Sequence, residues 1–314
     1  MTDFVFIVGL PRTGTKLLMN VLENSPNRAC HITPENFFLG RFMRPGIRNQ
    51  MHKLGDFSDD ARVSQLVDQI FQGHYSVFKG DYWWLAAQGE LRLDAATVKK
   101  MILESDRSDK ALYQILLQAY AGSDENVILG DKTGPHLYHM STLMEWFPHA
   151  KVVHTFRDPR AILASEHKKQ LAKLDRQVTK AQNKGNHLQA FGLKMRKPFS
   201  SLLTVFYVTI AWLAAARLDK QYKEKYPDNY YLSSFESLVQ NPEDSIKAIC
   251  SFLDIEFQEA MLNPPKVDSS FSPKGGSGFN TQTLNRWETY LKPWMKAWVV
   301  FWNRKYLKAF DYIH

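Results

Sequence analysis

The most regular apolar pattern in the chain lies at its amino end. Residues 4–8 are apolar throughout, and so short a run without polar alternation predicts a strand buried on both faces of a parallel sheet. A loop bounded by Gly9 and Gly14 follows, and leucine and valine then recur at helical spacing until Ser25-Pro26. This stretch therefore predicts a strand, a loop and a helix in that order.

The alternation of strand and helix continues along the chain. Short apolar runs at 127–129, 152–156 and 230–232 predict three further strands. Helices are expected from Pro159 to Gln170 and from Pro242 to Leu253, each with proline in its first turn. Alternating strands and helices predict an α/β fold, in which a central parallel sheet is flanked by helices in a three-layer sandwich.

Two stretches depart from this pattern and are expected to be inserts in a single domain spanning 1–314. Residues 41–121 are mostly helical in pattern and rich in aromatic side chains. Residues 166–197 carry nine Lys or Arg residues against two acidic ones. We expect this basic stretch to be a solvated helix and loop, and the alternative is a lid or a docking surface for an acidic substrate.

Composition adds further constraints. Two cysteines, Cys30 and Cys250, are too few for a disulfide framework, and burial in a reduced, cytoplasmic protein is the simplest interpretation. The amino terminus lacks the features of a signal peptide, and we count no run of about 18 apolar residues, so no membrane span is expected. The net charge of +8 favours an anionic partner without identifying it.

The loop after the first strand has the features of an anion site. Backbone N–H groups at a helix N-terminus point outward, and the helix dipole favours negative charge there. Arg12 supplies a forked cation, Thr13 and Thr15 supply hydroxyl donors, and Gly14 permits close backbone approach. The loop therefore predicts a phosphate site, and the alternative is a glycine-rich turn without a ligand.

The position of the lysine argues against a nucleoside triphosphate. In the triphosphate loop, Gly-x-x-x-x-Gly-Lys-[Ser/Thr], lysine directly follows the second glycine. Here Thr15 follows Gly14, so Lys16 comes one position late, and Leu17 stands where a Mg²⁺-binding hydroxyl should be. One residue turns a helical side chain by about 100°. The loop therefore fits a phosphate but fits Mg-ATP poorly.

The same run resembles the 5′-phosphosulfate loop of sulfotransferases that use 3′-phosphoadenosine 5′-phosphosulfate (PAPS). That loop is usually Pro-[Lys/Arg]-[Ser/Thr]-Gly-Thr-[Thr/Ser], and this chain differs only where Lys16 replaces the last hydroxyl. The resemblance covers about residues 4–290 and implies a P-loop-like fold, PAPS as donor and 3′-phosphoadenosine 5′-phosphate (PAP) as product. The donor-binding residues that it implies here are Pro11, Arg12, Thr13, Gly14, Thr15 and Lys16. In motif layout the chain is most similar to bacterial members related to tyrosine sulfotransferases.

A second anion motif of this family is matched downstream. Arg157 follows the strand 152–156, and Ser165 lies eight residues later in the expected helix. The pair resembles the family's 3′-phosphate motif, in which the arginine binds bidentately and the serine adds a neutral donor. Arg160 either assists this site or pairs with groups nearby.

A glycine-rich segment near the carboxyl end extends the resemblance. Lys274, Gly275 and Gly276 precede the pair Arg286-Trp287. The family commonly closes over the nucleotide with such a basic segment and an Arg-Trp pair, which implies that these five residues contact the donor. By themselves the glycines indicate only a flexible loop.

Sulfuryl transfer needs a base for the acceptor proton and a cation for the bridging oxygen. The resemblance implies Glu35 as the base, with His31 as second choice, whereas an exposed acid that begins a helix is the alternative for Glu35. Lys132 follows the strand 127–129, at the end where ligands bind in open α/β sheets, and is expected to be the cation. Arg12 would serve the leaving phosphate. No metal is expected, since the sequence has neither His-Glu-x-x-His nor Cys-x-x-Cys.

The acceptor is predicted only to carry a hydroxyl, which suits a glutamate base. Tyr82, Trp83 and Trp84 could stack on a sugar or an aromatic ring, with core packing as the alternative. Aromatic residues from Trp294 to Trp302 recur at helical spacing beside basic ones, so a membrane-surface acceptor such as a glycolipid stays open. A carbohydrate, a small alcohol or phenol and a peptide tyrosine are the other candidates. We expect no nucleic-acid partner, and the sequence indicates no oligomeric state.

Two other functions stay open. A P-loop kinase of small molecules is opposed by Lys16 and by our finding no apolar strand that ends in a Mg²⁺-binding aspartate. A non-catalytic nucleotide- or polyanion-binding protein would keep Arg12, Arg157 and Ser165. It would not need Glu35 or Lys132.

Overall fold

The computed structural model describes residues 4–25, 29–41, 44–71, 76–78, 81–82, 91–124, 127–265 and 278–313. Its strands are β1 (Phe4–Gly9), β2 (Cys30–Thr33), β3 (Gly40–Arg41), β4 (Arg44–Pro45), β5 (Ser76–Phe78), β6 (Asp81–Tyr82), β7 (Ile128–Asp131), β8 (Lys151–Phe156) and β9 (Tyr230–Ser234). Its α-helices are α1 (Thr15–Glu23), α2 (Ile47–Met51), α3 (Asp60–Phe71), α5 (Ala95–Glu104), α6 (Asp109–Ala121), α7 (Met140–Trp146), α8 (Pro159–Asn183), α9 (His187–Lys225), α10 (Phe235–Gln240), α11 (Pro242–Leu253), α12 (Arg286–Tyr290) and α13 (Pro293–Ala309). Its short 3₁₀ helices are η1 (His52–Leu54), η2 (Gly134–His139), η3 (Glu259–Leu262) and η4 (Thr281–Thr283).

Five parallel strands form the central sheet, in the order β2-β7-β1-β8-β9. The strand β1 lies in the middle and is buried along its whole length, which explains its uninterrupted apolar run. The sequence pattern predicts four of these strands but misses β2. That strand is a four-residue Cys-His-Ile-Thr segment, too short and too polar in its middle to stand out.

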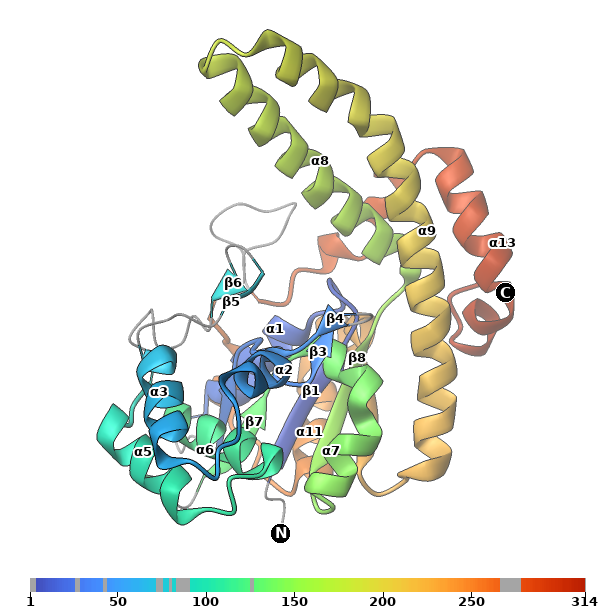
Figure 1. Ribbon diagram of the computed structural model, residues 1–314. Coiled ribbons are helices and arrows are strands. Elements are labelled where there is room, and N and C mark those ends of the chain that lie inside the picture. The colour runs from blue at the N-terminus through green and yellow to red at the C-terminus, as the bar shows by residue number, and fades with distance from the viewer. Residues whose placement is uncertain are drawn as a thin grey trace.

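Helices cover both faces of this sheet, which confirms the predicted three-layer α/β sandwich (Figure 1). Alternate residues of β1 point to opposite faces, as in any strand. Phe4, Phe6 and Val8 belong to a core shared with α6, α7, α9 and α13. Val5 and Ile7 belong to a second core shared with α1, α10 and α11. Cys30 and Cys250 are both buried as free thiols, as expected.

The insert expected at 41–121 is mostly helical where the structure describes it. It contributes α2, α3, α5 and α6, together with the short antiparallel pairs β3–β4 and β5–β6. Tyr82 ends β6, and Trp83 and Trp84 lie outside the described residues. The proposed stacking role of these aromatic residues therefore stays a prediction.

The basic stretch forms part of a helical hairpin much longer than predicted. The helix expected to end near Gln170 continues to Asn183, and α9 then runs for 39 residues. Figure 1 shows this hairpin projecting away from the sheet, with α13 beside α9. The expectation that no segment is long and apolar enough to span a membrane is wrong. The helix α9 meets both criteria, since it contains an 18-residue window of mean hydropathy 1.8. The fold buries 39% of that window, since the carboxyl-terminal half of α9 packs on the sheet.

Candidate active site at the carboxyl edge of the sheet

The predicted catalytic and phosphate-binding residues follow the carboxyl ends of four neighbouring strands. The phosphate loop follows β1, Glu35 follows β2, Lys132 follows β7 and Arg157 follows β8. Because all four strands are parallel, their carboxyl ends lie at one edge of the sheet, where ligands bind in open α/β folds. Segments more than a hundred residues apart in sequence therefore meet there.

The phosphate loop turns sharply into α1. Gly14 is the N-cap residue of that helix with φ 97°, and a β-carbon there would clash with the Phe235 ring. Arg12 also has a positive φ, 74°, a conformation that costs energy for a residue other than glycine. The first N–H groups of any helix have no partner within it, so those of α1 are directed to this edge. Pro11 is exposed in the turn.

Three predicted donors in the loop have different surroundings. The Thr13 hydroxyl is buried, donating to the Leu10 carbonyl at 2.7 Å and lying 2.7 Å from the Thr155 hydroxyl. Its side chain therefore braces the loop from inside. Thr15 begins α1 and is partly exposed, and Lys16 follows it with an exposed side chain.

The loop and the second anion motif are joined by hydrogen bonds. Arg12 Nε donates to Ser165 Oγ at 2.8 Å, and Arg157 Nη1 donates to the carbonyl oxygen of Arg12 at 3.1 Å. Arg157 Nη2 donates to the carbonyl of Thr283 at 2.9 Å. The structure thus brings together two arginines and a serine that the sequence assigned to two separate phosphates.

Arg157 is nearly enclosed by protein. Its residue is 7% exposed, and its guanidinium lies 4.0 Å from the centre of the Phe235 ring. Burial lowers its pKa to about 10, against the opposing effect of Glu236, so it stays cationic at neutral pH. Within the described part of the chain its buried Nε has no hydrogen-bond partner. The group therefore keeps one donor for an anion.

Burial also lowers the pKa of Arg12, and the neighbouring Glu166 carboxylate opposes that shift. Glu166 is itself buried, and among described groups its Oε2 has no hydrogen-bond partner. Sequence reasoning missed this residue although it directly follows Ser165. The predicted phosphate region thus holds the buried Arg157 and the partly buried Arg12, with Glu166 and Glu236 as acids close to them.

The predicted base and cation are neighbours. Lys132 Nζ lies 3.6 Å from Glu35 Oε1, and the two side chains are 8% and 47% exposed respectively. The loop that carries Lys132 packs directly on the start of the phosphate loop. The approach at Gly134 is so close that a β-carbon there would clash with the carbonyl oxygen of Gly9. His31, the second choice of base, is buried within β2 with its Nε2 3.4 Å from Arg92 Nη1.

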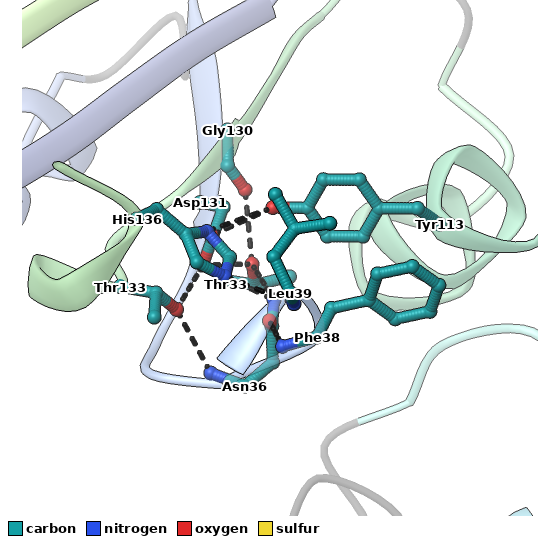
Figure 2. Close-up of polar contacts among 9 residues, drawn as sticks. All are labelled: Thr33, Asn36, Phe38, Leu39, Tyr113, Gly130, Asp131, Thr133 and His136. Atoms are coloured by element: carbon teal, nitrogen blue, oxygen red, sulfur yellow. Dashed lines mark hydrogen bonds and ion pairs between the residues drawn. The ribbon is translucent and has the colours of Figure 1, made fainter. Parts of the chain in front are cut away.

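A buried polar network centred on Asp131 involves the residues that directly follow this pair in sequence (Figure 2). One carboxylate oxygen accepts from Thr133 Oγ1 at 2.8 Å and from Asn36 Nδ2 at 3.1 Å. The other accepts from the Tyr113 hydroxyl at 2.7 Å and lies 2.7 Å from His136 Nδ1. Because Asn36 and Thr133 directly follow Glu35 and Lys132, the network fixes both loops relative to each other.

The network also corrects one sequence argument. The strand β7 does end in an aspartate beside β1, contrary to our finding of no such strand. Both oxygens of Asp131 are nevertheless occupied by protein donors, which leaves a Mg²⁺ ion little to bind. Among the described residues, no group of three or more His, Cys, Asp or Glu side chains could hold a metal.

The carboxyl-terminal motif lies beside the second anion motif. Arg286 and Trp287 begin α12, which packs on α8. The Trp287 ring lies 4.1 Å from the guanidinium of Arg160, whose Nη2 donates to Asp158 at 2.6 Å. Arg160 therefore pairs locally, one of the two roles weighed for it. Lys274, Gly275 and Gly276 lie outside the described residues, so their predicted contact with the donor stays a prediction.

The geometry of this edge agrees with comparisons of the chain with known proteins. The family model described as "Sulfotransferase family" matches residues 4–259. The chain belongs to the sulfotransferase family. The resemblance inferred from the motifs is thereby confirmed, and the matched residues include every described site residue except Arg286 and Trp287.

Two curated sulfotransferases are similar in sequence at low identity. The protein-tyrosine sulfotransferase of Drosophila melanogaster is 23% identical over 261 residues, 82% of this chain and 39% of the fly protein. The omega-hydroxy-beta-dihydromenaquinone-9 sulfotransferase Stf3 of Mycobacterium bovis is 27% identical over 172 residues, 51% of this chain and 43% of that protein. The chain thus spans about two fifths of the length of these sulfotransferases.

Solved sulfotransferase domains share the fold. The domain from the Synechococcus PCC 7002 olefin synthase superposes with a TM-score of 0.55 at 17% identity, covering 97% of this chain and 94% of that domain. The domain from the curacin biosynthetic pathway gives a TM-score of 0.53 at 15% identity and covers 97% of both chains. At these identities the likeness supports the sulfotransferase fold and nothing finer.

Proposed function

We propose that this sulfotransferase moves the sulfuryl group of PAPS to an acceptor hydroxyl. The observation that carries the proposal is the meeting of Arg12, Ser165 and Arg157 with the Lys132–Glu35 pair at one edge of the sheet. The first three are suited to binding a nucleotide with two separate phosphate groups. The last two are suited to proton removal and charge stabilisation.

The described residues fit such a donor. The start of α1 and the Arg12 guanidinium would hold the 5′-phosphosulfate, since helix N-termini and arginine both favour phosphate oxygens. Arg157 and Ser165 would hold the 3′-phosphate, for which the buried Nε of Arg157 offers an unused donor. Trp287, which contacts Arg160, and its neighbour Arg286 are proposed to help enclose this phosphate.

The chemistry supplied by bound PAPS is an activated sulfuryl group with PAP as leaving group. The half-exposed Glu35 carboxylate would accept the proton of the acceptor hydroxyl. The Lys132 ammonium is proposed to stabilise charge on the bridging oxygen, and Arg12 charge on the leaving phosphate. The Asp131 network would keep the first two groups in register, because small misplacements in such sites are costly.

The alternatives fit the geometry less well. A kinase would need a lysine directly after Gly14 and an aspartate free to bind Mg²⁺. In this chain Lys16 comes one position later, and both carboxylate oxygens of Asp131 already accept hydrogen bonds from protein groups. A non-catalytic binding protein would have no use for the contact between Lys132 and Glu35. For the acceptor, the two curated relatives are named for tyrosine and for an omega-hydroxylated quinone. Both carry hydroxyl groups, which supports a hydroxyl acceptor here.

Thermal unfolding with PAP, ADP and ATP-Mg²⁺ tests this proposal. We expect PAP at about 100-fold excess over its dissociation constant to stabilise the protein by about 2.7 kcal/mol, because it binds only the folded state. ATP-Mg²⁺ and ADP should give smaller shifts, since neither carries a 3′-phosphate for Arg157. Stabilisation by ATP-Mg²⁺ with none by PAP would reject the proposal in favour of a kinase.

A further inference from the structure

One face of α9 is apolar and open to solvent over much of its length. From Leu188 the exposed apolar residues continue through Phe191, Met195, Phe199 and Phe206 to Ile210, with Leu188 83% exposed. Their spacing of three, four or seven residues places them on one side of the helix. At 1.5 Å per residue the stripe is about 33 Å long. All six side chains are exposed, Phe206 least of them because it contacts α13.

The stripe continues onto α13. The Phe206 and Trp298 rings lie 4.8 Å apart, Trp298 and Trp302 5.7 Å apart, and Phe301 and Trp302 5.5 Å apart. Phe301 is 74% exposed, and Trp294 one helical turn before Trp298 is also exposed. The two helices therefore form one continuous surface, which we name the α9–α13 apolar surface.

Basic residues are concentrated in the segments that carry this surface or adjoin it in sequence. Residues 292–309 contain five Lys or Arg residues and no acidic residue, and residues 166–197 contain nine against two. Lys305 and Lys308 continue the spacing of the exposed α13 stripe, four and seven residues after Phe301. Long basic side chains of this kind keep their charge at a polar boundary while their stems cover apolar surface.

We propose that the α9–α13 apolar surface docks on an anionic membrane, with its helices lying in the plane of the interface. Apolar faces edged with Lys and Arg bind such membranes by burying apolar area and attracting anionic headgroups. Tryptophan, present three times on α13, favours this boundary because one end of its ring system is polar. The positive charge near this surface is thus complementary to the negative charge of the lipid headgroups.

The core contacts of α9 oppose a membrane-spanning orientation of this helix. Trp212 is fully buried, and its Nε1 donates to the carbonyl of Arg157 at 2.9 Å, so this half of the helix belongs to the core. The hairpin tip at 183–187 is polar and cationic, which opposes insertion end first. A helix lying flat keeps the core contacts and buries the exposed stripe.

A second copy of the chain fits the surface poorly. A two-fold interface brings the same patch of both copies together. The cations of 292–309 would then face their own counterparts without an acid in that segment to pair with. An anionic lipid layer removes this repulsion and also covers the aromatic residues.

Docking would place the donor site near lipid. The hairpin begins at Pro159, two residues after Arg157, so the surface is an extension of the same strand end (Figure 1). If the proposed function holds, the acceptor hydroxyl would belong to a molecule held in the membrane. Docking itself is independent of that step.

Flotation of the full chain with vesicles tests the inference. We expect binding to vesicles of phosphatidylcholine with phosphatidylglycerol, weak binding to phosphatidylcholine alone, and weaker binding at high salt. The double variant Phe191→Ser with Phe301→Ser should lower binding by at least about tenfold, since each ring loses its burial in lipid. Lys305→Glu should lower binding to anionic vesicles only. Lys100→Glu, an exposed helical lysine on α5 far from α13, is the matched control and should have no effect (Figure 1).

Three outcomes would overturn the inference. They are a wild-type chain that ignores anionic vesicles, a double variant that binds like wild type, and a solution dimer that the double variant abolishes. PAP stabilisation of the same samples reports on the proposed function separately. A chain that binds PAP but no vesicle would lose only the membrane inference, and the reverse result would lose only the proposed function.

Discussion

Glu35→Gln is expected to lower kcat for sulfuryl transfer by about 10²- to 10⁴-fold, the usual contribution of a positioned general base. The amide keeps the size of the side chain but cannot accept the proton of the acceptor hydroxyl. Affinity for PAP should be unchanged, because Glu35 contacts Lys132 and is not one of the residues proposed to hold the two phosphates. Transfer of ³⁵S from labelled PAPS at saturating donor, together with calorimetry of PAP binding, measures both quantities.

Glu104→Gln is the matched control for this change. Its carboxylate also lies near a lysine, 3.8 Å from Lys100 Nζ, but on an exposed helix. Its transfer rate should equal that of wild type.

Lys132→Ala should behave like Glu35→Gln, with a loss of about 10²- to 10³-fold in kcat and unchanged PAP affinity. A full rate for Glu35→Gln would show that another group, with His31 as second choice, removes the proton.

The second large effect is expected at Arg157. Arg157→Ala should weaken PAP binding by about 10- to 150-fold, since hydrogen bonds to charged groups contribute about 1.5–3 kcal/mol. AMP, which lacks the 3′-phosphate, should lose little affinity. Calorimetry with both nucleotides gives the ratio of the two dissociation constants, which separates recognition of the 3′-phosphate from general damage to the fold.

Two further variants sharpen this result. Ser165→Ala removes one neutral donor and should produce a smaller loss of PAP affinity in the same direction. Arg62→Ala, which changes a half-exposed arginine on α3, should change neither nucleotide. An equal loss of PAP and AMP affinity in Arg157→Ala would assign the residue to the support of the loop, through its bond to the Arg12 carbonyl.

Local patterns were sufficient to predict the strand, loop and helix around the phosphate site. The run 4–8 is apolar because β1 is the middle strand of the sheet, and Gly14 is required by a positive φ at the helix start. The residues proposed for catalysis followed from their places after strands, since parallel strands present their carboxyl ends together. The meeting of Arg12 with Arg157 is then a consequence of β1 pairing with β8.

What the sequence did not reveal depends on contacts between distant segments. β2 is a short strand that is recognisable only through its pairing with β7. Asp131, at the end of β7, accepts hydrogen bonds from Asn36 after β2 and from Tyr113 on α6. The contact between the Thr13 and Thr155 hydroxyls joins residues 142 positions apart in sequence. The apolar face of α9 was missed because the first half of the helix projects from the core. Its apolar side chains are exposed there, so they do not mark a buried face.

The most direct test of the central claim offers the chain two labelled donors with one panel of hydroxyl acceptors. The panel should include peptide tyrosine, sugars, simple alcohols and phenols, and lipids presented in anionic vesicles. We predict that ³⁵S from PAPS enters an acceptor and that γ-³²P from ATP with Mg²⁺ enters none, with ³⁵S transfer strongly reduced in Glu35→Gln. Transfer of ³²P, or PAP binding with no ³⁵S transfer to any acceptor, would contradict the assignment of this chain as a PAPS-dependent sulfotransferase.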